Sequence, residues 1–197
     1  MALQSHSPPV ALILGHSFLR RLKLDLYSAF DSRASKCFGF GEVALVQLFG
    51  VGGRTIPRVR KFDLHVVSRT QPSIVVLELG TNDLSVSRPE VIGSQLHDFV
   101  LELLHDFQVR IVAVCKVIPR VPMSLTEVNL NAQAAVLNQY LDVVLSDLDR
   151  VFVWKHKGFS SPSSLLFLPD GVHLNSRGQY ALYRSYRGAI LAALRFL

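Results

Sequence analysis

Short apolar runs alternate with longer segments of helical periodicity along almost the whole chain. The clearest run is residues 73–79, SIVVLEL, which is rich in β-branched residues and bounded by Pro72 and Gly80, as is typical of a buried strand. Strands that alternate with helices indicate a parallel sheet covered on both faces. The right-handed crossover rule then favours a flavodoxin-like, doubly wound topology. The predicted fold is an α/β, three-layer α/β/α sandwich around a five-stranded parallel sheet.

The element boundaries follow from hydrophobic periodicity and from the positions of Pro and Gly. Strands are predicted at residues 10–14, 43–49, 73–79, 110–114 and 151–154. Helices are predicted at residues 18–30, 55–67, 89–107, 125–148 and 176–197. No internal repeat or linker interrupts the pattern, so a single domain spanning residues 1–197 is expected.

Composition excludes several classes of protein. Apolar residues make up 49% of the chain and charged residues 18%, which is typical of a dense globular protein rather than a disordered one. Two cysteines do not form a disulfide framework, and the first apolar run is too short for a signal peptide, so a cytoplasmic location is expected. No run approaches the roughly 18 apolar residues of a membrane span.

Four short motifs carry the chemistry, and each follows a predicted strand or a loop. Because the carboxyl ends of parallel strands meet at one edge of a sheet, the motifs are expected to converge there. They are Gly15-His16-Ser17, Gly52-Gly53, Gly80-Thr81-Asn82-Asp83 and Asp170-Gly171-Val172-His173.

The residue types in these motifs suit acyl transfer. Ser17 is a candidate nucleophile if His173 takes its proton and Asp170 fixes the tautomer of that imidazole. A developing oxyanion needs preorganised donors. The backbone N–H groups of Ser17 and Gly53 and the side-chain amide of Asn82 are candidates for this role.

Together the four motifs resemble the conserved blocks of the SGNH hydrolases, also called GDSL-type esterases and lipases. The resemblance extends from Val10 to the last predicted helix. It implies hydrolysis of small-molecule or lipid carboxylic esters, with Ser17 as nucleophile and without a cofactor or metal. The position of Gly53 before Arg54 implies that it is the oxyanion glycine. One departure is His16, since the family usually has Asp there; this imidazole is expected to alter local hydrogen bonding or substrate preference.

The basic character of the chain, with a net charge of +6, favours anionic partners. Several basic residues are predicted to lie near the carboxyl ends of strands, which favours an anionic ester such as a phospholipid or an acidic glycan ester. They are Arg20, Arg21, Arg54, Lys116, Arg120, Lys155 and Lys157. Arg54 and Asp83 are also candidate substrate-binding residues. Alternatively, these are simply solvated loop residues.

A second reading of the whole chain remains open. A non-catalytic accessory or binding module on the same fold, encoded by a mobile element, would use its basic surface to bind nucleic acid or an anionic membrane. Ser17 alone is equally typical of a helix cap, and Asp170-Gly171 alone of a turn. The remaining histidines, His6, His65, His97, His105 and His156, show no metal-ligand spacing, so no metal site is expected.

Overall fold

The computed structural model describes residues 7–28 and 37–197, and these form a sheet of five parallel strands. The strands are β1 (Val10–Gly15), β2 (Leu45–Gly50), β3 (Ile74–Glu78), β4 (Ile111–Cys115) and β5 (Val151–Trp154). Their order across the sheet is β2-β1-β3-β4-β5, and every neighbouring pair is parallel. The predicted five-stranded, doubly wound sheet is confirmed.

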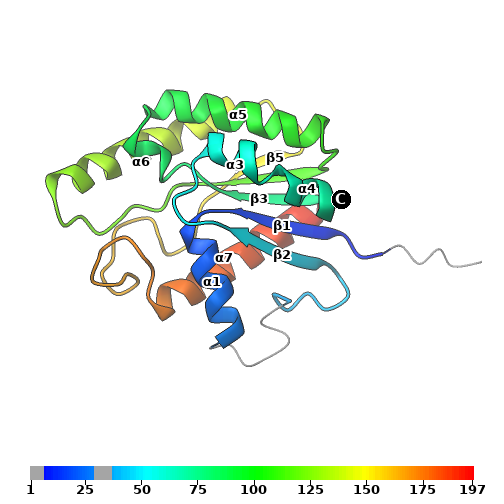
Figure 1. Ribbon diagram of the computed structural model, residues 1–197, viewed down its shortest axis with the longest axis horizontal. Helices are drawn as coiled ribbons and strands as arrows, with labels where there is room; N and C mark the ends of the chain where they lie inside the picture. The colour runs from blue at the N-terminus through cyan, green and yellow to red at the C-terminus, as the bar shows by residue number, and fades with distance from the viewer. Residues whose placement is uncertain (1–6, 29–36) are drawn as a thin grey trace, which may run out of the picture.

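Helices cover both faces of the sheet, as Figure 1 shows. One face carries α1 (Ser17–Ser28) and α7 (Ser176–Leu194). The other carries α3 (Ile56–Phe62), α4 (Leu64–Thr70), α5 (Pro89–His105) and α6 (Leu125–Val144). A short 3₁₀ helix, η1 (Asp83–Ser85), follows the third strand. The result is the three-layer α/β/α sandwich that the alternating pattern predicts.

The inner strands are continuous apolar runs because both of their faces are covered. In β1, Leu12 and Leu14 face the core beneath α3–α6, while Ala11 and Ile13 face the core beneath α1 and α7. This alternation follows from the two-residue period of a strand. All five residues of β3 are buried, whereas the edge strand β2 is only partly buried.

The helix predicted at residues 55–67 is wrong in one respect, because it is broken into α3 and α4 at Asp63. The Asp63 N–H donates to the carbonyl of Val59, which closes α3, and the Asp63 carbonyl accepts from Val66, which opens α4. The Asp63 carboxylate is held by Arg54 through two hydrogen bonds of 2.7 and 3.0 Å. This ion pair holds the Asp63 side chain at the point where α3 ends and α4 begins.

Other predicted boundaries shift by a few residues. The helix predicted at 125–148 ends at Val144, where the Ser146 hydroxyl donates to the carbonyl of Val143 at 2.8 Å and competes with the helical bond. The strand predicted at 43–49 is β2, which begins two residues later. The last two residues of the helix predicted at 18–30 lie outside the described residues.

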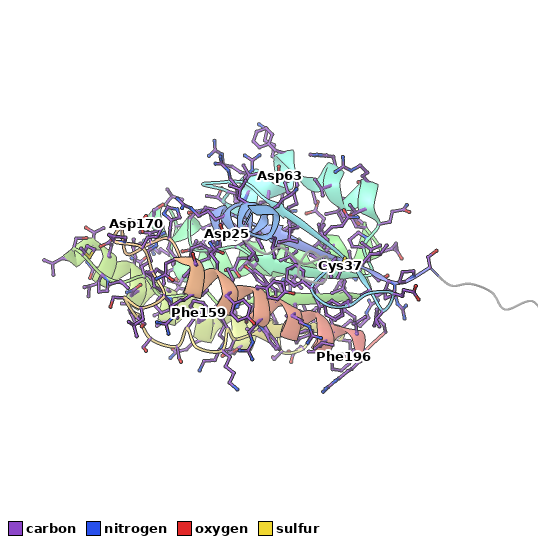
Figure 2. The ribbon with its side chains drawn as sticks, turned by 90° about the horizontal axis from the view of Figure 1, so that it is seen from below. Asp25, Cys37, Asp63, Phe159, Asp170 and Phe196 are labelled. Carbon is purple, nitrogen blue, oxygen red and sulfur yellow. The ribbon has the colours of Figure 1, made fainter. Side chains whose placement is uncertain are left out.

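Since all five strands run in the same direction, the loops that follow them gather at one edge of the sheet, at the left of Figure 1. Figure 2 shows Asp170 at this end of the molecule, with Cys37 and Phe196 toward the other end. In a sheet of this type ligands bind at the carboxyl edge. Among the helices of the described residues, none has the length and apolar character needed to cross a bilayer.

Candidate functional site

A cavity of about 580 Å³ opens at the carboxyl edge of the sheet. Residues from all four sequence motifs line it, although they are separated by up to 156 positions along the chain. The lining residues are Ser17, Arg20, Arg21, Leu24, Gly52, Gly53, Asn82, Arg120, Val172 and His173. The structure therefore brings the predicted nucleophile, the two other oxyanion donors and the predicted base to one cavity.

Ser17 is the first residue of α1 and lies two positions after the end of β1. The His16 carbonyl accepts hydrogen bonds from the N–H groups of Leu19 and Arg20, at 3.2 and 3.3 Å, and so forms the first turn of the helix. The N–H of a first helical residue has no intrahelical acceptor. Because the helix dipole also places partial positive charge here, this end of α1 suits a developing negative charge.

Asp170 and His173 form a pair in the loop before α7. The His173 Nδ1 lies 2.7 Å from Asp170 Oδ2, while Asp170 Oδ1 accepts from the N–H groups of His173 and Val172 at 2.8 and 2.9 Å. Partial burial alone raises the pKa of Asp170, but these hydrogen bonds outweigh it and lower the pKa to about 2. The ionised carboxylate favours a proton on Nδ1, which leaves Nε2 as a proton acceptor.

Two glycines fix the loops that carry site residues. Gly171 has a φ of +67°, and a Cβ there would lie 2.4 Å from the carbonyl oxygen of Val121, so no larger residue fits between Asp170 and His173. Gly53 has a φ of +68° with open space around its Cβ position. Glycine is therefore favoured at position 53 by backbone conformation rather than by lack of room.

Hydrogen bonds join the second and third motifs. The Asn82 side-chain amide donates to the carbonyl of Arg54 at 2.9 Å, and the N–H of Ile56 donates to Asp83 Oδ1 at 2.9 Å. Burial raises the pKa of Asp83, which is only 2% exposed. Arg54 and Asp83, the candidate substrate-binding residues, are thus engaged with the protein itself and are not among the described residues that line the cavity.

The loop after β4 joins the third motif to the fourth. One guanidinium nitrogen of Arg120 lies 3.4 and 3.5 Å from the carbonyl and hydroxyl oxygens of Thr81. The neighbouring Val121 N–H donates to the carbonyl of Gly171 at 2.9 Å. Because these links connect residues far apart in sequence, the second, third and fourth motifs are held as one unit.

His16, which stands where the resemblance leads us to expect Asp, directly precedes Ser17 and is 1% exposed. The N–H of Phe18 donates to its Nδ1 at 3.4 Å, so in the neutral ring the proton is on Nε2, which lies 3.8 Å from Glu78 Oε1. Burial lowers the pKa of His16 to about 4. The Glu78 carboxylate opposes this effect, and the charges of Arg120, His156 and His173 reinforce it.

Glu78 is the centre of a buried polar network that the sequence did not predict. Its Oε2 accepts from His156 Nε2 at 2.9 Å and from the Tyr186 hydroxyl at 2.8 Å. The other ring nitrogen of His156 lies 2.8 Å from the hydroxyl of Ser185. Burial alone raises the pKa of Glu78, but His156, His16 and the Tyr186 hydroxyl together lower it. The one available signal was a lone acid in the apolar run 73–79.

Glu78, Cys115 and His156 each have a possible ligand atom within 4.8 Å of the others, so they could hold a metal ion. However, the Glu78 carboxylate is already paired with His156 and Tyr186. Burial raises the pKa of the Cys115 thiol well above its usual value, whereas a metal ligand must be a thiolate. The donor set therefore fits a hydrogen-bonded network better than a metal site.

The depressed pKa of His16 predicts that the protein loses stability in mild acid. His16 stays neutral in the folded chain down to about pH 4, whereas in the unfolded chain it binds a proton near pH 6.5. Protonation of the unfolded state should therefore lower the free energy of unfolding by about 2 kcal/mol between pH 7 and pH 5. In urea titrations at these two pH values, His16→Asn should reduce this loss, and replacement of the exposed His65 by Asn should not. An equal loss in wild type and His16→Asn would contradict the assignment.

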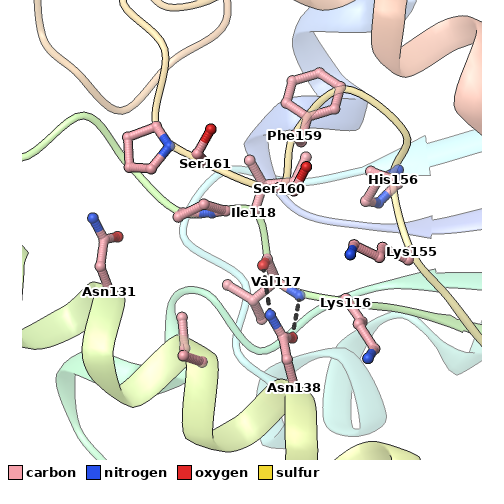
Figure 3. A pocket seen from close by; sticks show the side chains of 14 residues that line it. Lys116, Val117, Ile118, Asn131, Asn138, Lys155, His156, Phe159, Ser160 and Ser161 are labelled. Carbon is pink, nitrogen blue, oxygen red and sulfur yellow. Dashed lines mark hydrogen bonds between the residues drawn. The ribbon is translucent and has the colours of Figure 1, made fainter.

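A second cavity, of about 320 Å³, lies beside the ends of β4 and β5, and Figure 3 shows its lining. The amide of Asn138 is bonded to both backbone groups of Val117 there, at 2.7 and 2.9 Å. Lys116 and Lys155 line this cavity rather than the one that contains Ser17, and Lys116 pairs with Asp142 at 2.5 Å. Three of the basic residues predicted to surround the site line the cavity that contains Ser17: Arg20, Arg21 and Arg120.

Comparison with known proteins connects this geometry to a family. A family model described as the GDSL-like lipase/acylhydrolase family matches residues 22–181. No curated protein sequence matches the chain. Because the match begins after Ser17, the assignment of the nucleophile depends on the cavity rather than on the family match.

Solved structures share the fold. A carbohydrate esterase family 3 protein from Talaromyces cellulolyticus has a TM-score of 0.71 at 16% identity, with 96% of this chain and 99% of that chain covered. A GDSL-like lipase from Bacteroides thetaiotaomicron has a TM-score of 0.70 at 16% identity, with 95% and 92% covered. An acetyl xylan esterase has a TM-score of 0.70 at 17% identity, with 92% and 99% covered. At such identities the likeness establishes the fold alone.

Proposed function

Because the chain belongs to the GDSL-like lipase/acylhydrolase family, we propose that it is a serine esterase that hydrolyses carboxylic esters through an acyl-enzyme. Family membership supports ester hydrolysis as the class of reaction. One observation supports the roles proposed for individual residues: Ser17, Gly53, Asn82 and His173 line the same cavity. The pairing of His173 with Asp170 at 2.7 Å supports its role as the base.

The first half of the reaction forms the acyl-enzyme. Ser17 Oγ attacks the ester carbonyl carbon while His173 Nε2 takes the hydroxyl proton. The carbonyl π electrons move to oxygen, which becomes the oxyanion of a tetrahedral intermediate. When the intermediate collapses, the bond to the alcohol oxygen breaks and His173 gives its proton to that oxygen. The acyl group is then bonded to Ser17.

The second half regenerates the enzyme. His173 takes a proton from water, which attacks the acyl carbon, and the collapse of the second intermediate returns Ser17 Oγ with the proton from His173. Throughout, Asp170 remains ionised, since its pKa is about 2, and it stabilises the charged imidazole. One carboxylic acid and one alcohol are released for each water consumed.

Three donors are proposed to stabilise the oxyanion. They are the N–H of Ser17 at the start of α1, the N–H of Gly53 and the second N–H of the Asn82 amide. The other N–H of that amide is used by the carbonyl of Arg54, which fixes the direction of the side chain. Fixed donors need no reorganisation when charge develops, and this is why they lower the barrier.

Replacement of Asn82 tests the proposal. On a series of p-nitrophenyl esters from acetate to decanoate, wild-type protein should show turnover, and Asn82→Ala should reduce kcat by about 10²–10³-fold, as for loss of one oxyanion donor. The measurement is release of p-nitrophenolate by purified protein.

A matched variant separates catalysis from folding. Asn129 is exposed on α6, and Asn129→Ala should leave kcat unchanged. Both variants should be compared with wild type by circular dichroism, since Asn82 also anchors the Arg54 carbonyl. The proposal fails if wild-type protein hydrolyses no ester of the series faster than buffer does.

A further inference from the structure

Three guanidinium groups lie in the lining of the cavity that contains Ser17 and His173. Arg20 and Arg21 come from α1, and Arg120 comes from the loop after β4. Among the described residues that line this cavity, none is acidic. The described lining therefore carries the positive charge of three arginines and no negative charge of its own.

The position of Arg120 is fixed by its backbone rather than by its charge. Its N–H donates to Asn131 Oδ1 at 2.8 Å, and its carbonyl accepts from the Asn131 amide at 2.7 Å. Among the residues that the structure describes, the guanidinium makes two long contacts, of 3.4 and 3.5 Å, both with Thr81. Since a guanidinium has five N–H donors, several of them can serve a ligand. Its charge acts close to the nucleophile, because it helps to lower the pKa of the adjacent His16.

These arginines differ from other cations of the protein. Arg54, Arg60 and Lys116 each pair with a carboxylate, at 2.7, 2.7 and 2.5 Å. Within residues 7–28 and 37–197, no ion pair of 4.0 Å or less involves Arg20, Arg21 or Arg120.

The carboxylates near the three arginines offset their charge only in part. Asp25 lies one turn after Arg21 on α1. Burial raises the pKa of Asp25, and the positive charge of Arg21 partly offsets this rise. Asp170 is paired with His173, and Glu78 with His156 and Tyr186. Arg20 and Arg120 therefore carry the charge that is most available to a ligand.

We infer that the cavity accepts an ester that bears an anionic group, a carboxylate or a phosphate, bound by Arg120 and Arg20. This inference rests on the proposed esterase function and names its substrate class. Both kinds of anion present oxygen acceptors that match the fork of donors on a guanidinium. Because Arg20 is exposed and Arg120 only half-buried, a neutral ester would gain none of these charge-assisted hydrogen bonds, whereas an anionic ester would gain one or more of them.

Matched pairs of esters test the inference. The first pair is p-nitrophenyl hydrogen glutarate and p-nitrophenyl pentanoate, which place a carboxylate or a methyl group on the acyl side. The second pair is 4-acetoxybenzoate and its neutral methyl ester, and the third is 4-acetoxyphenyl phosphate and 4-acetoxyanisole. The three pairs distinguish an anion on the acyl side from one on the alcohol side, and a carboxylate from a phosphate.

The readout is the ratio of kcat/KM for the anionic ester to that for its neutral partner. In at least one pair, Arg120→Gln and Arg20→Gln should each lower this ratio by about tenfold, the effect of one hydrogen bond between charged groups. Arg69→Gln, which removes an exposed charge on α4, should leave the ratio unchanged. Ratios that do not change in the Arg120→Gln, Arg20→Gln double variant, for all three pairs, would overturn the inference.

A binding measurement separates this inference from the proposed function. Ser17→Ala protein should bind the anionic ester of the preferred pair more tightly than its neutral partner in isothermal titration calorimetry. Addition of Arg120→Gln to this protein should abolish the difference. If neutral esters are hydrolysed but Arg120 affects neither the kcat/KM ratio nor the difference in binding, the inference fails and the esterase function stands. If no ester is hydrolysed but the Arg120-dependent preference in binding is present, the anionic specificity stands and the catalytic proposal fails.

Discussion

Replacement of Ser17 by alanine should abolish ester turnover while leaving the fold intact. Without Oγ no acyl-enzyme can form, and the remaining oxyanion donors cannot supply a nucleophile. We expect kcat on short p-nitrophenyl esters to fall by at least about 10⁴-fold, as in other serine hydrolases that lose the nucleophile. The measurement is steady-state release of p-nitrophenolate, with the background rate in buffer subtracted.

The control for this variant is Ser160→Ala. Ser160 is exposed and lines the second cavity, so this change removes a hydroxyl near the same edge of the sheet without touching the site. Its kcat should equal that of wild type, and the free energy of unfolding of either variant should differ from wild type by no more than about 1 kcal/mol. Retention of more than a tenth of wild-type kcat by Ser17→Ala would show that another group is the nucleophile.

Replacement of Asp170 by asparagine should have the second-largest effect, a fall in kcat of about 10⁴-fold. The Asn amide would donate to His173 Nδ1, so the ring proton would move to Nε2, and that nitrogen could no longer accept the proton of Ser17. Since Asp170 Oδ1 also accepts two backbone N–H bonds, an Asn oxygen at that position keeps the loop in place. The geometry is therefore retained while the tautomer is reversed.

Asp149→Asn is the matched control, because Asp149 is exposed and precedes β5 at the opposite edge of the sheet. It should leave kcat unchanged. The wild-type profile adds a second check: with a pKa of about 2, Asp170 stays ionised throughout the range from pH 4 to pH 9. Titration of Asp170 should therefore cause no loss of activity in that range. A kcat for Asp170→Asn within tenfold of wild type would contradict the role given to the pair.

The sheet and the convergence of the site could be predicted because they depend on local patterns. β-branched runs bounded by Pro or Gly identify buried strands such as 73–79, and a sheet of parallel strands places the ends of all of them at one edge. Ser17, Asn82 and His173 each follow such an end or lie in the last loop. Topology therefore predicts that these residues gather at one edge of the sheet, and tertiary packing decides which side chains share a cavity there.

Features that depend on particular side-chain pairs could not be predicted. The helix predicted at 55–67 breaks at Asp63, whose carboxylate Arg54 binds, and the helical pattern contains no sign of that bond. Glu78 is stabilised in the core by His156 and Tyr186, which lie 78 and 108 positions further along the chain. Lys116 and Arg120 both follow β4, yet only Arg120 lines the cavity of Ser17, because the direction of each side chain is set by tertiary packing.

Labelling with a fluorophosphonate tests the central claim, that Ser17 is an activated nucleophile, most directly. The Ser17 oxygen should attack phosphorus and displace fluoride, with His173 taking the hydroxyl proton. Peptide mapping by mass spectrometry should then find one phosphonyl group per chain on Ser17, and none on Ser17→Ala protein. Labelling of a different serine, or ester turnover by wild-type protein whose Ser17 stays unlabelled, would contradict the account.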